Sequence, residues 1–231
     1  MAAPQSLDTV LNHPAIWRGG SCARVSTPSV PTGFAEFDAV LPGGGWPAAA
    51  LTEIYVERPG IGELKLIMPA AARLTYAGRW VALVAPPYIP YAPALAAHGV
   101  RLARLMLVRT TGSADSLWAC EQALRSAGCG AVLAWLDHAP ERALRRLQLA
   151  AEGSDVVMLL FRSARGIPPS SAALRLHLGK TGGRTIVRVL KRRGAGIPTP
   201  VALDLHDPPA MRATAANLSV SGRLHRLAAL P

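Results

Sequence analysis

The residues with the clearest chemical potential lie in the turn ERPGIGELKL, residues 57–66, between the apolar run LTEIYV and a helix-forming segment. In a parallel α/β sheet the turn after the first strand commonly binds phosphate, because glycines let backbone amides approach the anion and the next helix offers its N-terminus. A working phosphate-binding loop has the pattern GxxxxGK[ST], in which the lysine contacts the phosphates and the hydroxyl holds magnesium. This turn is therefore the candidate nucleotide site.

The turn departs from that pattern at its functional positions. Gly60 and Gly62 supply the glycines, but Glu63 and Leu64 stand where the lysine and the hydroxyl are needed. An acidic side chain repels phosphate, and leucine cannot coordinate a metal ion. Lys65 comes too late in the chain and lies on a different helical face. We therefore expect a degenerate site without a cofactor, in which the glycines only turn the chain into the helix.

The surrounding hydrophobic pattern indicates which elements would position this turn. Apolar, β-prone runs lie at 51–56, 79–85, 104–108, 130–135 and 155–161. The segments of helical character between them are 63–78, 90–98, 113–127 and 140–152. Strands that are apolar throughout and alternate with helices are typical of a parallel sheet covered on both faces. The predicted fold class is α/β, with a mostly parallel central sheet flanked by helices.

Composition divides the 231-residue chain into three parts. Residues 1–50 are rich in Pro, Gly, Ser and Thr and predict an extended N-terminal arm. Residues 51–206 form the α/β domain, and beyond residue 170 the runs RLHLG, RTIVRVLKRR and TPVALDLH predict antiparallel strands at its C-terminal end. Residues 207–231 are left as a short tail. The length suits one domain with modest extensions.

The chain is strongly basic, with a formal net charge of +11 from 25 Lys and Arg against 14 Asp and Glu. A basic surface attracts nucleic acid through phosphate contacts, but arginines spread over a solvated surface give the same total, and both interpretations stay open. The candidate nucleic-acid residues are Arg162, Arg165, Arg188, Lys191, Arg192 and Arg193. Charges on a solvated strand edge, which protect it from pairing with another chain, are the alternative interpretation.

Several other classes of protein are disfavoured. The uncharged run from Trp80 to Ala97 contains four prolines, which favours a strand and a turn over a membrane span. The first residues lack a basic segment leading into an apolar stretch, so no targeting sequence is predicted. The three cysteines and six histidines show no metal-ligand spacing. We expect reduced thiols, a cytoplasmic location and no metal.

Three segments resemble the RecA family. Residues 31–55, PTGFAEFDAVLPGGGWPAAALTEIY, resemble the stretch that leads into the RecA phosphate-binding loop. Residues 79–100 resemble the next strand and helix, and residues 117–137 resemble the following helix and the strand that ends in the Walker B aspartate. The resemblance runs from about residue 31 to 205 and implies a RecA-like core.

The resemblance also shows which catalytic groups of RecA are absent. The catalytic glutamate follows the second strand in RecA, and Pro86 or Pro87 occupies that place here. Trp135 falls on the Walker B aspartate, while Asp137 lies beyond it. The two DNA-contacting loops of RecA are also reduced, which implies weak and sequence-independent DNA binding at most. The lysine, hydroxyl, glutamate and aspartate are therefore all out of place, and we expect a pseudoenzyme.

Within this superfamily the chain is most similar to the ImuA family. HPAIWRG at 13–19, TGFAEFDAVLPGGGWP at 32–47 and RRLQLAAE at 145–152 resemble motifs of that group. The resemblance implies an accessory role in SOS-induced translesion synthesis and mutagenesis. The implied partners are an ImuB-like polymerase-related protein, an error-prone DnaE-type polymerase complex and RecA itself. A SulA-like inhibitor of cell division and a weak RecA-like ATPase or DNA-binding protein are the alternatives.

Two segments outside the predicted domain are candidates for partner binding. In the arm, Ile16 and Trp17 resemble in placement the apolar residues with which RecA-family arms dock on a neighbour, although Trp17 could equally pack on its own domain. In the tail, the candidates are the apolar residues Leu218, Val220, Leu224 and Leu227.

Overall fold

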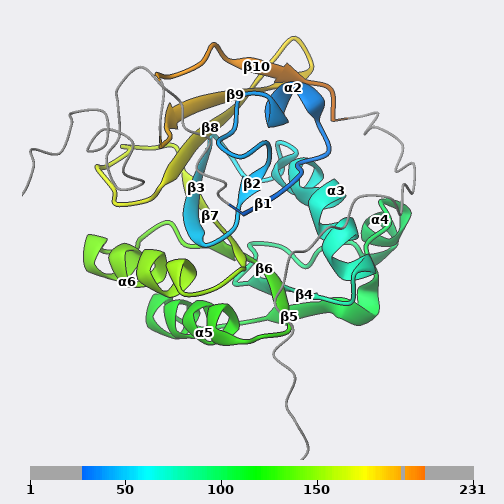
Figure 1. Ribbon diagram of the computed structural model, residues 1–231, viewed down its shortest axis with the longest axis vertical. Coiled ribbons are helices and arrows are strands. Elements are labelled where there is room, and N and C mark those ends of the chain that lie inside the picture. Colours follow the sequence, from blue (N-terminus) through cyan, green and yellow to red (C-terminus); the bar gives the residue numbers. More distant parts are fainter. Residues whose placement is uncertain (1–27, 194–195, 206–231) are drawn as a thin grey trace, which may run out of the picture.

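The computed structural model describes residues 28–193 and 196–205, which build an eight-stranded sheet between helices (Figure 1). The strands in spatial order are β10 (Val201–Leu203), β9 (Arg184–Lys191), β8 (Leu174–Thr181), β3 (Ala50–Val56), β7 (Val157–Ser163), β6 (Cys129–Trp135), β4 (Trp80–Val84) and β5 (Leu105–Val108). All pairs from β8 to β5 are parallel, while β8, β9 and β10 pair antiparallel. The prediction of a mostly parallel α/β sheet with antiparallel strands at the C-terminal end is confirmed.

Helices cover both faces of the parallel part of the sheet. They are α3 (Glu63–Tyr76), α4 (Ala92–Ala97), α5 (Ser113–Arg125) and α6 (Glu141–Glu152), with a short 3-10 turn, η1 (Leu102–Arg104), before β5. Alternate residues of β7 point to opposite faces, so that Leu159 packs in the α3 cluster and Leu160 in the α5–α6 cluster. Because both faces are buried, the strands are apolar throughout, which is the pattern seen in the sequence.

Helix α6 follows the predicted amphipathic pattern. Leu144 and Leu147 are buried against the sheet, while Arg142 and Arg145 are exposed on the other side of the helix. None of the helices within the described ranges has both the length and the apolar character of a membrane span.

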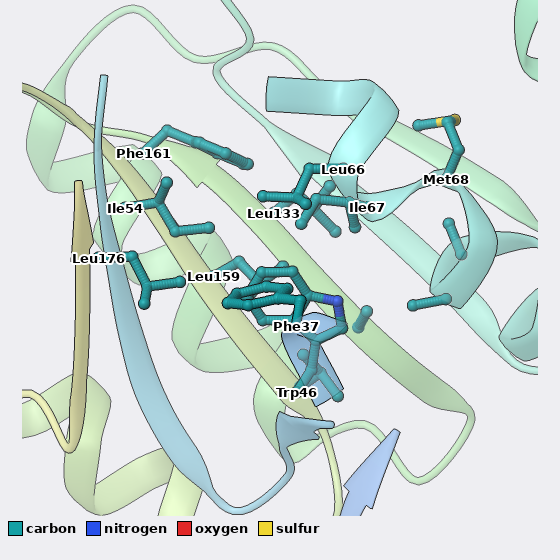
Figure 2. Packing of buried hydrophobic residues seen from close by; sticks show 14 of the residues in the cluster. Phe37, Trp46, Ile54, Leu66, Ile67, Met68, Leu133, Leu159, Phe161 and Leu176 are labelled. Atoms are coloured by element: carbon teal, nitrogen blue, oxygen red, sulfur yellow. The ribbon is translucent and has the colours of Figure 1, made fainter. Parts of the chain in front are cut away.

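The segment that precedes β3 packs against the core. β1 (Ser29–Val30) and β2 (Trp46–Pro47) form an antiparallel ribbon, and α2 (Ala35–Asp38) lies between them in the chain. The rings of Phe37 and Trp46, both without exposed surface, meet edge to face with centroids 5.4 Å apart. Figure 2 shows them in the same cluster as Leu66 and Leu159.

A close backbone approach explains one glycine of this segment. Gly33 has a φ of 92°, and a Cβ at this position would lie 2.4 Å from Cβ of Pro69 on α3. Only glycine fits there, so the TG turn of the sequence lets the segment pass directly over the helix.

The predicted division of the chain is only partly visible. Residues 28–49, which the sequence placed in an extended arm, instead contain short strands and a helical turn whose apolar side chains are buried in the core. Residues 1–27 and 207–231 lie outside the described residues. The division into arm, domain and tail therefore stays a prediction.

Replacing Phe37 by alanine tests whether residues 28–49 belong to the core. Phe37→Ala should lower the free energy of unfolding by about 3–5 kcal/mol, because it removes a fully buried ring and leaves a cavity. Tyr91→Ala is the matched control, since Tyr91 is 72% exposed. Denaturant unfolding measures both. Equal stability of Phe37→Ala and the wild type would mean that this segment only lies on the surface of the fold.

Candidate functional site

The turn after β3 keeps the backbone shape of an anion-binding loop. Gly60 has a φ of 84° and Gly62, at the N-cap of α3, a φ of 111°, both in the left-handed region that favours glycine. Successive backbone amides in such a turn point into one concavity and, with the helix N-terminus, attract a negative charge. The loop is therefore built to hold an anion.

The anion that it holds is a side chain of the protein. The amide of Gly60 donates to the Glu63 carboxylate at 2.8 Å from Oε1 and 3.1 Å from Oε2, and the amide of Gly62 donates to Oε2 at 3.2 Å. Glu63 is only 6% exposed. The carboxylate thus uses the amides that a phosphate would need, and a phosphate at this position would face a second negative charge.

The other residues around this turn are also unsuited to nucleotide chemistry. Leu64 is half-buried and packs against the core, and Lys65 points into solvent as an exposed side chain. Pro86 follows β4, directly after Ala85, which has a φ of 51°. This is a strained conformation for alanine, and such strain is concentrated at functional sites.

At the end of β6, Trp135 takes the position that the sequence analysis compared with the Walker B aspartate. Its ring stacks on Phe161 of β7 with centroids 4.8 Å apart. Asp137 lies beyond the strand, exposed, and its Oδ1 accepts a hydrogen bond from the Ser163 amide at 2.9 Å. Here Asp137 fixes the backbone of a neighbouring strand.

These strand ends enclose a pocket of about 360 Å³. It lies at the carboxyl ends of β3, β4, β6 and β7, where parallel sheets usually bind ligands. Its wall includes Pro87, Trp135, Asp137, Glu57, Arg58 and Arg165. The pocket therefore brings Pro87, Trp135 and Asp137 together with Glu57 and Arg58, whereas Gly60, Gly62, Glu63, Leu64 and Pro86 are not part of its wall.

A buried ion cluster supports this edge. Glu53, in the middle of β3, has no exposed surface, and its Oε1 accepts from Arg162 at 2.7 Å while its Oε2 accepts from Arg175 at 3.1 Å. Tyr55, two residues further along the same face, donates its hydroxyl to Glu53 and accepts from Arg175 at 2.7 Å. Burial raises the pKa of the Tyr55 phenol, and the hydrogen bond from Arg175 opposes this shift.

Glu53 was not among the functional residues predicted from the sequence. The sequence does hold one clue to its role, which is a glutamate inside a mostly apolar strand. A charged side chain in a strand whose sheet is covered on both faces requires a partner of opposite charge. The partners could not be found from the strand itself, since Arg162 and Arg175 lie 109 and 122 residues away in the chain.

The predicted nucleic-acid residues do not form one free basic strip. Arg162 is 6% exposed and paired with Glu53, which argues against a contact with phosphate. The other side chains have separate environments. Lys191 donates to Ser170 O, Arg192 to Val40 O and Gly196 O, and Arg193 pairs with Glu152, while Arg165 and Arg188 are exposed. A nucleic-acid role for the five exposed or half-buried residues stays a prediction.

The remaining reactive groups do not form a site. Burial raises the pKa of Cys120 to about 12 and that of Cys129 to about 11, so neither thiol is a ready nucleophile. Within residues 28–193 and 196–205, no three His, Cys, Asp or Glu side chains lie close enough to hold a metal ion. The predicted partner-binding residues Ile16, Trp17, Leu218, Val220, Leu224 and Leu227 lie outside the described residues.

Comparison of the sequence with known proteins finds relatives of two kinds. No family model matches the chain. Over 133 residues it is 29% identical to "Cell division inhibitor SulA" of Edwardsiella piscicida, a match that covers 55% of this chain and 79% of that protein. Over 137 residues it is 34% identical to "Protein ImuA" of Caulobacter vibrioides, covering 56% of this chain and 55% of that protein. The chain thus spans about half the length of that ImuA protein and is ImuA/SulA-like.

Removing the Glu63 carboxylate should free the amides of Gly60 and Gly62 to bind an added anion. Glu63→Ala should lower the free energy of unfolding by about 1–3 kcal/mol, because the part-buried amides of Gly60 and Gly62 lose their charged acceptor. Added pyrophosphate should then raise the melting temperature of the variant but not that of the wild type, since binding to the folded state alone stabilises it. Thermal melting at several pyrophosphate concentrations measures this. Lys65→Ala is the control, and stabilisation of the wild type by pyrophosphate would contradict the assignment.

Disrupting the buried cluster should cost more than disrupting a surface pair. Glu53→Ala should lower the free energy of unfolding by about 3–5 kcal/mol, because it leaves two buried guanidinium groups without their carboxylate. The surface control, Arg193→Ala, should change it by less than about 1 kcal/mol, since both partners of that pair are well exposed. Urea unfolding measures the free energy of unfolding of both variants. Similar decreases in the two variants would mean that the buried cluster contributes no more to stability than a surface ion pair.

Proposed function

We propose that this ImuA/SulA-like protein is a non-catalytic accessory protein of a damage-induced translesion DNA synthesis complex, and that it acts by protein contacts. The observation that carries the proposal is the Glu63 carboxylate on the amides of Gly60 and Gly62. A RecA-like fold whose phosphate loop holds its own anion has no place for the triphosphate that drives a RecA-type cycle. The similarity to an ImuA protein supports the proposal that the process is translesion DNA synthesis.

The proposed partners follow from the ImuA resemblance. They are an ImuB-like polymerase-related protein, an error-prone DnaE-type polymerase and RecA, in the cytoplasm. Direct DNA contact would be weak, independent of sequence and steeply salt-dependent, because it would come from separate arginines meeting phosphates.

A second candidate function is inhibition of cell division. The observation in its favour is that the match to the SulA protein covers 79% of that protein. A degenerate nucleotide loop is equally compatible with this role, since capping a partner also needs no nucleotide turnover.

Capture from cells tests the two functions against each other. The tagged full chain, expressed in cells treated with a DNA-damaging agent, should retain polymerase-related proteins identified by mass spectrometry, and tag alone and untreated cells serve as controls. Retention of a tubulin-like division protein in place of these would support the second candidate. Magnesium-dependent ATP hydrolysis by the purified chain, well above a mock preparation, would contradict both.

A further inference from the structure

The outer surface of α5 and α6 combines exposed apolar and basic side chains. We define the α5–α6 surface by Trp118 and Arg125 of α5 together with Arg142, Arg145 and Leu149 of α6. The two helices lie side by side on the sheet, at the lower left of Figure 1. Trp118 is 64% exposed and Leu149 59%, although large apolar side chains on amphipathic helices normally face the core.

Helical spacing places these residues on the solvent side. Trp118 and Arg125 are seven residues apart, as are Arg142 and Leu149, so that each pair lies along one face of its helix. The opposite faces are occupied, because Leu124 and Leu147 are buried in the core. The apolar groups of the α5–α6 surface therefore have no role in the core of this chain.

Among the described residues, the unpaired charges of α5 and α6 are three arginines against the two carboxylates of Asp115 and Glu141. Arg146 pairs with Glu121 at 2.8 Å. Among the residues that the structure describes, Arg125, Arg142 and Arg145 have no ion-pair partner. The exposed acidic residues on the two helices are Asp115, Glu141 and Glu152, of which Glu152 is already paired with Arg193. The surplus guanidinium groups are complementary to carboxylates.

A groove of about 440 Å³ lies between the C-terminal halves of the two helices. Leu124, Leu149 and Ala150 give it an apolar wall, and Arg125 and Arg146 lie at its sides. The groove can therefore take an apolar side chain while guanidinium groups meet acidic neighbours of that side chain.

We propose that the α5–α6 surface binds an acidic, amphipathic segment of a protein partner, with carboxylates on Arg125, Arg142 and Arg145 and an apolar side chain against Leu149. One feature favours a protein over a nucleic acid. The apolar wall of the groove is aliphatic and does not include Trp118, so it suits an apolar side chain and gives a base no aromatic face on which to stack. The identification of this partner with the translesion complex rests on the proposed function, but the chemistry of the surface does not.

Selection of random peptides displayed on phage, with the full chain immobilised, tests the proposal. The selected peptides should be enriched in Asp or Glu together with Leu, Phe or Trp. A synthetic selected peptide, measured by fluorescence anisotropy, should bind about tenfold more weakly or worse to Trp118→Ala and to the double variant Arg142→Glu/Arg145→Glu. The matched control Arg73→Glu/Lys180→Glu makes the same change in net charge at two exposed residues elsewhere and should bind within about twofold of the wild type. Unchanged melting curves establish that all variants fold.

Three results would overturn the proposal: selected peptides without acidic residues, equal binding to the surface and control variants, or labelled oligo(dT) that binds this surface when no peptide does. Capture from damage-treated cells separates it from the proposed function. If the wild type retains polymerase components but a selected peptide binds equally to the wild type and to Arg142→Glu/Arg145→Glu, this surface is wrong and the proposed function stands. If peptide binding depends on the surface but no polymerase component is retained, the surface stands and the proposed function is wrong.

Discussion

The burial of the Glu53 carboxylate in the middle of the sheet is the constraint on which the ligand-facing edge depends. A charge without exposed surface must be neutralised inside the fold, and arginines from β7 and β8, the two neighbours of β3, do this. The same arginines donate to the backbone carbonyls of Asp137 and Pro168. The cluster of Glu53, Arg162 and Arg175 therefore links β3, β7 and β8 to one another and to the loops that follow β6 and β7.

The loop that follows β3 satisfies its own backbone amides with a side chain of the protein. Left-handed glycines turn their amides toward a common point, and such donors need an acceptor when they are shielded from water. Glu63 supplies it from the first turn of the same helix, where a carboxylate also interacts favourably with the helix dipole. The loop thus keeps its shape without a ligand.

The two faces of the sheet differ in what they leave for partners. On the α3 face the segment before β3 adds Phe37 and Trp46 to the core, while Tyr76 of α3 stays exposed. On the α5–α6 face the helices bury one side and present arginines, a tryptophan and a leucine on the other. The α5–α6 surface therefore offers both apolar and basic groups outside the pocket at the strand ends.

The sequence alone determined the elements and the departures from the phosphate-loop pattern. Apolar runs and amphipathic spacing are local signals, so the strands and helices were predicted close to their observed bounds, and the replaced lysine and hydroxyl could be seen at Glu63 and Leu64. Only the tertiary structure decided where charges find partners. Arg162 is buried on Glu53 and Arg142 is free in solvent, yet as residues in a chain they look alike. The reason is physical: ion pairing and burial depend on side chains from distant strands, and those neighbours exist only after the sheet has assembled.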